Sequence, residues 1–140
     1  MATDKRMRRW ACSRTQGILF LSKQKVWQIV IHIVRTRATQ QQMSEMLEML
    51  GTYVKLAVDI RRRILAGGGA MHADCEAALL EDGSQQADVW GADWNPTTQQ
   101  VTFESLINIR PRQNNSALEI LDPDLQQQVA YITRELLEGV

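Results

Sequence analysis

The sequence contains few of the residues that build metal centres, redox sites and disulfide frameworks. Its only cysteines, Cys12 and Cys75, lie far apart in the chain, and neither belongs to a C-x-x-C pair of the kind that binds zinc or cycles between thiol and disulfide. This scarcity argues against a zinc framework and against a small domain held together by disulfides. It favours a reducing compartment, so we expect a cytoplasmic protein.

Long apolar runs and nucleotide-binding loops are also missing. The longest apolar run near the start of the chain covers residues 18–21, which is too short for the core of a signal peptide or for a membrane span. Three consecutive glycines, Gly67, Gly68 and Gly69, do not fit the G-x-G-x-x-G or G-x-x-x-x-G-K-[ST] pattern of phosphate loops. We therefore expect a protein that does not enter membranes and that carries no standard nucleotide loop.

Charge is distributed unevenly although its total is zero, with 16 basic and 16 acidic residues. Residues 1–28 carry seven Lys or Arg against the single acid Asp4, so this tail has a net charge of +6 and the rest of the chain −6. Two interpretations stay open for the tail. It is either a basic arm that touches nucleic acid or another acidic surface, or an extension that does not fold, including sequence translated from a start codon placed too early.

Residues 29–140 have the size and composition of one domain, and their periodicity predicts alternating strands and helices. We expect strands over residues 29–34, 54–61, 64–66, 89–94 and 101–110, and helices over residues 39–50, 74–80 and 123–137. Gly51 and Gly83 end the first two helices, and Asp122 with Pro123 begins the third. This order predicts an α+β domain in which about three helices pack on one face of a mainly antiparallel sheet of four to five strands.

Two details of this prediction concern strand faces and turns. The period of two in residues 89–94 places Trp90 and Trp94 on one face, where their large side chains are expected to be buried. The three arginines at residues 61–63 are expected to form a solvated turn, although such a cluster is also able to hold an anion.

The densest group of chemically capable residues lies in residues 57–84, with the sequence AVDIRRRILAGGGAMHADCEAALLEDGS. Together with the later segments VWGADW and FESLINIRPRQ, this stretch resembles a bacterial family, well represented in cyanobacteria, that is catalogued as domain of unknown function 5674. The resemblance covers residues 31–138 and implies no mechanism. Two features depart from the family: its proteins usually start close to Ile31, and a glycine is expected where this chain has Arg63.

One hypothesis for this group is a metal-assisted hydrolase-type enzyme. His72, Asp74 and Glu76 are the candidate ligands of a divalent metal, and His72, Glu76 and Arg110 are the candidate catalytic residues. Glu104, Asn108 and Arg110 would reach the same site from the polar face of the strand over residues 101–110. The alternative gives Asp74 to a helix cap and Glu76 to the first helical turn, where the helix dipole favours a carboxylate.

The second hypothesis, which asks less of the sequence, is a non-catalytic binding or regulatory module that recognises a ligand, a protein partner or a second copy of itself. Its candidate ligand-binding residues are Gly67, Gly68, Gly69, Asn108 and Arg110, because glycine lets the backbone approach a ligand closely. Nucleic acid is not expected to bind the acidic body, although the arginines 61, 62, 63, 110 and 112 would be its contact patch.

We predict that residues 1–28 are dispensable for folding, because their apolar residues follow neither a helical nor a strand period. A chain that lacks them should unfold cooperatively and melt within a few degrees of the full chain, as measured by circular dichroism. A loss of cooperative unfolding would contradict the prediction.

Overall fold

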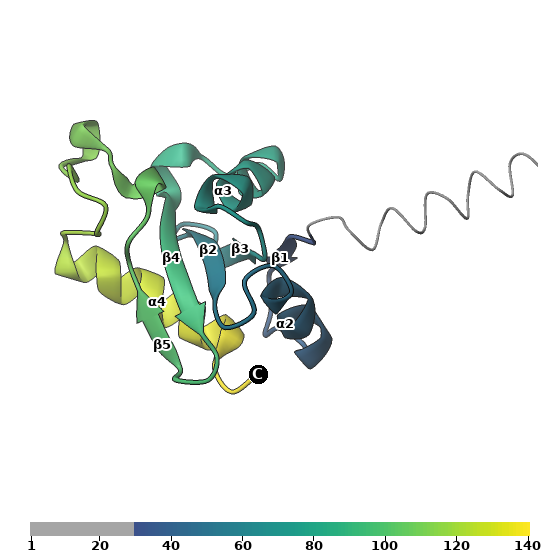
Figure 1. The fold of residues 1–140 in the computed structure, drawn as a ribbon. Coiled ribbons are helices and arrows are strands. Elements are labelled where there is room, and N and C mark those ends of the chain that lie inside the picture. The colour runs from purple at the N-terminus through teal and green to yellow at the C-terminus, as the bar shows by residue number, and fades with distance from the viewer. Residues whose placement is uncertain (1–29) are drawn as a thin grey trace, which may run out of the picture.

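The computed structural model describes residues 30–140, which form a sheet with helices on both of its sides (Figure 1). The predictions for residues 1–28 lie outside this part of the chain. None of the helices in residues 30–140 has the length and apolar composition needed to cross a bilayer.

The sheet has five strands in the order β1-β3-β2-β4-β5, and every neighbouring pair is antiparallel. The strands are β1 His32–Val34, β2 Val54–Asp59, β3 Ile64–Gly67, β4 Val89–Asn95 and β5 Gln100–Thr102. The helices are α2 Gln40–Leu47, α3 His72–Glu81 and α4 Pro123–Leu137, with three short 3-10 helices, η1 Gln86–Asp88, η2 Leu106–Asn108 and η3 Pro111–Gln113. The predicted α+β class and antiparallel sheet are confirmed.

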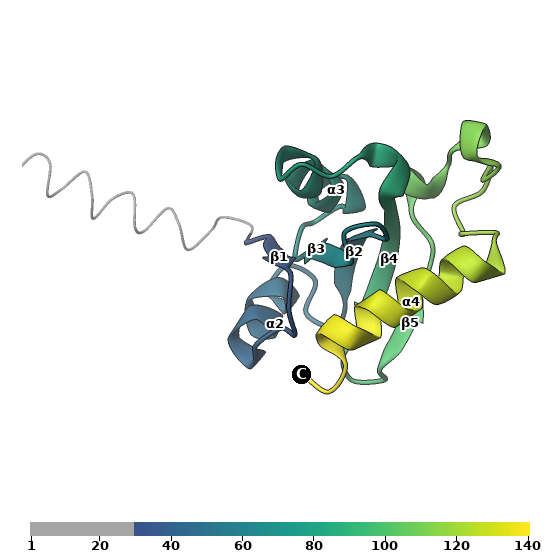
Figure 2. The same ribbon diagram turned by 180° about the vertical axis from the view of Figure 1, so that it is seen from behind.

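The helices cover both faces of the sheet, so the prediction that all of them pack on one face was wrong. Helices α2 and α4 lie against the face that carries Leu56, Val58 and both predicted core tryptophans, and Figure 2 shows α4 crossing the sheet on that side. Helix α3 covers the opposite face through Cys75 and Leu79. Helices are needed on both faces because all four residues of β3 are buried and the central strands carry apolar side chains on each face.

Local hydrogen bonds explain where two of the helices begin. The Thr39 hydroxyl accepts from the Gln42 N–H at 3.1 Å and the Gln42 side chain accepts from the Thr39 N–H at 3.0 Å, which is a complete capping box. The Asp122 carboxylate accepts from the Asp124 N–H before α4, as its position next to Pro123 predicted.

Helix α3 begins earlier than predicted. Its N-cap is Met71, and Asp74 lies in the first turn, where its carboxylate accepts from the Met71 N–H at 3.2 Å. Asp74 therefore supports the N-terminus from inside the helix and does not precede it. His72 is therefore the first residue of the helix.

The turn between β2 and β3 forms although Arg63 replaces the expected glycine. The buried Asp59 accepts from the N–H groups of Arg61 and Arg62, both at 2.9 Å, which closes the turn from within. Arg63 then adopts a left-handed conformation with φ of 58°. Its side chain pairs with Glu135 and lies over the ring of Tyr131, so contacts with α4 hold this strained residue.

The predicted strand over residues 101–110 was wrong beyond its first residues, because β5 ends at Thr102. The Ser105 hydroxyl accepts from the Ile107 N–H and starts η2. Asn108 then replaces the missing strand: its side-chain oxygen accepts from the Gly91 N–H at 2.8 Å and its side-chain nitrogen donates to the Gly91 carbonyl at 3.0 Å. A side-chain amide carries the same donor and acceptor as a peptide group, so it satisfies the edge of β4 without a continuing strand.

We predict that Trp90→Ala lowers the free energy of unfolding by about 3–5 kcal/mol, because it empties the space of a large buried aromatic side chain. Urea denaturation measures the loss. Tyr131→Ala is the matched control, since that aromatic side chain is 61 % exposed and its removal should cost much less. Near-native stability of Trp90→Ala would contradict the burial on which the fold rests.

Candidate functional site

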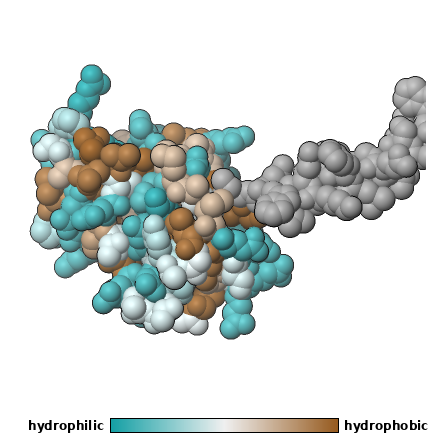
Figure 3. Space-filling view, in the orientation of Figure 1, coloured by the Kyte–Doolittle hydropathy of each residue, from teal (hydrophilic) through white to brown (hydrophobic). Residues whose placement is uncertain are grey.

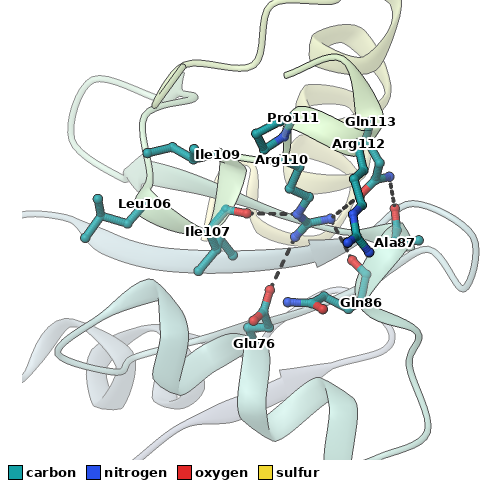
Figure 4. Close-up of a pocket in the computed structure, with 10 residues that line it drawn as sticks. All are labelled: Glu76, Gln86, Ala87, Leu106, Ile107, Ile109, Arg110, Pro111, Arg112 and Gln113. Carbon is teal, nitrogen blue, oxygen red and sulfur yellow. Dashed lines mark hydrogen bonds and ion pairs between the residues drawn. The ribbon is translucent and has the colours of Figure 1, made fainter. Parts of the chain in front are cut away.

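A cavity of about 640 Å³ lies between α3 and the segment that carries η2 and η3 (Figure 4). One side is apolar, and two of its members remain exposed although they are large: Leu106 by 69 % and Ile109 by 43 %. The other side is polar. The lining residues are Glu76, Gln86, Ala87, Leu106, Ile107, Ile109, Arg110, Pro111, Arg112 and Gln113.

Arg110 holds the walls of this cavity together. Its guanidinium donates to carbonyl oxygens of three segments and to two side chains: the carbonyls of Ile107, Gln86 and Val89, and the side chains of Gln113 and Glu76. The same group lies 4.5 Å from the centre of the Trp90 ring. Because an arginine has five N–H donors, Arg110 is fully engaged within the protein and fixes the relative positions of α3, β4 and η3.

Arg110 and Glu76 form the most buried ion pair of residues 30–140, with 9 % and 13 % of their side chains exposed and an Nη2 to Oε2 distance of 3.3 Å. Burial raises the pKa of the Glu76 carboxyl above its ordinary value, although the charge of Arg110 and a hydrogen bond from Gln86 act in the opposite direction. Burial likewise lowers the pKa of Arg110, against the effect of Glu76. Such perturbed groups in a cavity are typical of functional sites.

The three candidate metal ligands do not meet. The His72 Nε2 atom lies 2.8 Å from the Asp93 Oδ1 atom on β4, Asp74 is bound to the start of its own helix, and Glu76 is paired with Arg110. Within residues 30–140, no group of three His, Cys, Asp or Glu side chains is arranged to hold a metal ion. His72, Asp74 and Glu76 lie close together in the sequence, but each side chain interacts with a different partner.

The three glycines are occupied by contacts within the protein. A Cβ atom on Gly67 would lie 2.8 Å from the side chain of Leu56, and one on Gly68 would lie 2.5 Å from the Val30 carbonyl. A Cβ atom on Gly69 would lie 3.1 Å from the side chains of Asp74 and Cys75 at the start of α3. Close packing of β3 against its neighbours therefore accounts for the glycines, and they do not reach the cavity.

Asn108 is fully buried, and protein groups use its side-chain amide. Besides its two bonds with Gly91, the side-chain nitrogen lies within hydrogen-bonding distance of the carbonyl oxygens of Phe103 and Leu118. Of the candidate ligand-binding residues, only Arg110 lines the cavity. Asn108 contributes indirectly, because it fixes the segment that forms the apolar wall.

The arginine turn is neutralised by carboxylates of this same chain. Arg61 pairs with Asp88, Arg62 with Asp82 and Arg63 with Glu135, at 2.8–3.0 Å. Together with the pairing of Arg110, this leaves a nucleic-acid contact patch in the body with little free positive charge.

The His72 imidazole is paired with the Asp93 carboxylate, and the side-chain hydrogen bonds of residues 30–140 do not join it to a hydroxyl or a thiol. The thiol on the same helix, Cys75, is fully buried and donates to the Lys55 carbonyl. Burial raises the pKa of the Cys75 thiol to about 11, so it stays protonated and unreactive near neutral pH.

Several cavity residues were not foreseen as site residues. Leu106, Ile107 and Ile109 were assigned to the faces of a strand, and Gln86 and Gln113 to connecting loops. One signal was available in the sequence: Pro111 and the polar run after it indicate an irregular segment, in which neighbouring apolar residues are not all drawn into a core.

The fold and the cavity define a small α+β domain with an open recess of mixed polarity between α3 and η3 as its main candidate site. The chain belongs to the family described as "Protein of unknown function (DUF5674)", which matches residues 32–136. This confirms the family resemblance drawn from the sequence. No curated protein and no solved structure matches the chain.

We predict that Glu76 makes stability depend on pH in an unusual direction for a carboxylate. Because its pKa is raised in the folded state, its contribution is fully present below the pKa of the unfolded chain and is lost as pH rises through the folded pKa. The protein should therefore lose stability relative to Glu76→Gln as pH rises above the ordinary glutamate pKa of about 4.3.

Urea denaturation of both proteins at several pH values measures this difference. Subtracting the Glu76→Gln values removes the titration of all other groups, including Asp82, whose pKa is lowered by Arg35 and Arg62. A parent protein that gains stability relative to the variant as pH rises would contradict the prediction.

Proposed function

We propose that this protein is a non-catalytic cytoplasmic module that binds a segment of a partner protein in the cavity between α3 and the η2–η3 segment. The observation that carries the proposal is the exposure of Leu106 and Ile109 at the rim of a cavity whose inner wall is fixed by a buried ion pair. Exposed apolar side chains beside a concave surface are typical of places where proteins meet.

The surface around the cavity supports this proposal. Figure 3 shows hydrophobic residues gathered at the upper left of the molecule, in the region of the segment that follows β5. Leu118 and Leu121 add exposed apolar surface to the connection between η3 and α4, and Leu118 is hydrogen-bonded through its carbonyl to the Ser105 N–H, next to Leu106. Exposed apolar side chains therefore also occur on the segment whose backbone is paired beside Leu106.

The rigidity of the site also favours binding. Arg110 and Asn108 hold η2 and η3 through side-chain hydrogen bonds, so the apolar rim is positioned before a partner arrives. A preformed surface loses less conformational entropy on binding, which raises affinity. The residues that hold it in place are themselves fully hydrogen-bonded.

Catalysis is less well supported by the same cavity. Glu76 is its one carboxylate, and that group is already paired with Arg110. The ten lining residues include no hydroxyl, thiol, imidazole or amine side chain that would serve as a nucleophile or as a second acid or base. Recognition asks only for the shape and polarity that these residues provide.

We predict that Leu106→Asp combined with Ile109→Asp weakens partner binding at least tenfold while the melting temperature changes little, because both side chains are exposed. The probe is a set of peptides enriched from a random display library on the parent protein, with affinities measured by fluorescence polarisation. Met49→Asp is the matched control, since Met49 is 40 % exposed and follows α2, which packs on the opposite face of the sheet from α3.

Unchanged affinity in the double variant, or a library that yields no binding peptide, would contradict the proposed site. Sedimentation of the parent protein and the double variant tests the case in which the partner is a second copy of this chain. A dimer that dissociates only in the double variant would identify that partner.

A further inference from the structure

The cavity contains a positive charge that no carboxylate of residues 30–140 neutralises. Arg112 is exposed, and among the arginines of this range it alone makes no ion pair and no hydrogen bond through its guanidinium. Figure 4 shows the side chain extending beside Arg110 toward Gln86, along the polar side of the cavity. Its donors are therefore available to a bound molecule.

The charges that line the cavity leave an excess of one positive charge. Arg110 and Arg112 contribute +2 and Glu76 contributes −1, so the sum is +1. The body of the chain after residue 28 carries nine basic and fifteen acidic residues, a net charge of −6. The cavity is thus a local positive site on a negative domain, and it favours a ligand of negative charge.

The two arginines play different roles. All the donors of Arg110 are used within the protein, so it contributes charge but no free hydrogen bond. Arg112 presents the planar fork of donors that pairs with both oxygens of a carboxylate. Glu76 repels a second negative group deeper in the cavity, and the acidic group of a ligand is therefore expected at the Arg112 rim.

We propose that the partner segment is acidic and apolar: a carboxylate that pairs with Arg112, next to a large apolar side chain that packs on Leu106 and Ile109. This inference rests on the proposed function and specifies what the cavity recognises. The apolar wall favours a ligand with an apolar group over a simple anion, because a simple anion would leave Leu106 and Ile109 in water. A nucleic acid strand is disfavoured, since one free arginine on an acidic body cannot neutralise a row of phosphates.

Three synthetic peptides test the inference. Each is an eight-residue chain of glycine and serine with blocked ends that contains two leucines, together with two aspartates, two asparagines or two lysines. Nuclear magnetic resonance titration follows the backbone amides of Leu106 and Ile109 and the side-chain Nε–H of Arg112. We expect the aspartate peptide to bind best and the lysine peptide worst, with all shifts at the cavity.

Two variants separate charge from structure. Arg112→Gln should weaken the aspartate peptide about fivefold, the effect of losing about 1 kcal/mol of ion-pair energy, and should leave the asparagine peptide unchanged. Arg134→Gln is the matched control, because it removes the same charge from the exposed surface of α4. It should leave the order of the three peptides unchanged.

The outcomes distinguish this inference from the function on which it rests. Equal binding of all three peptides at the cavity would overturn the acidic preference and keep the proposed binding site. Binding of none of them at the cavity would count against both. An Arg112 resonance that shifts as strongly with inorganic phosphate as with the aspartate peptide would show a simple anion site and overturn the requirement for an apolar neighbour.

Discussion

The segment that follows β5 depends on one interaction, the pair of hydrogen bonds between the Asn108 side-chain amide and the backbone of Gly91. Strand β5 is only three residues long, so the N–H and carbonyl of Gly91 on β4 would have no partner at that edge. Asn108 supplies both the donor and the acceptor, and the chain after β5 is thereby released from the sheet. Gly91 permits this, because a Cβ atom there would lie 2.4 Å from the Cβ atom of Ser105. Leaving such buried groups unpaired would cost about 1–3 kcal/mol each.

The cavity exists because the Asn108 side chain, and not a longer strand, pairs with the edge of β4. Once residues 103–118 leave the sheet, Arg110 ties them to the start of β4 and to α3 through Val89, Gln86 and Glu76. Removing that guanidinium from water disfavours its charged form. The ion pair with Glu76 and the contact with the Trp90 ring offset part of this loss of hydration free energy. A segment held by side chains in this way keeps Leu106 and Ile109 at the surface, where a strand would have directed one of them inward.

Elements whose stability is local were predicted well from the sequence. A helix that begins next to residue 39, the Asp122 and Pro123 start of α4, and the period of two that buries Trp90 and Trp94 all appear in the structure. The prediction failed where a residue far away in the sequence decided the outcome. The alternation in residues 101–110 indicated a strand, because a local pattern carries no information about the contact between Asn108 and Gly91. One hypothesis placed His72 and Glu76 in a shared site, but His72 pairs with Asp93 and Glu76 pairs with Arg110.

The sequence by itself determined the class of fold, the main helices and strands, and the family, because these follow from periodicity, caps and a contiguous pattern of residues. It also identified Glu76 and Arg110 as candidate site residues. Only the tertiary structure decided that these two pair in the wall of a cavity, that α3 covers the second face of the sheet, and that Arg112 has no carboxylate partner among residues 30–140. The physical reason is that ion pairs, desolvation and edge hydrogen bonds depend on distances between residues that lie 17 to 34 positions apart in the chain.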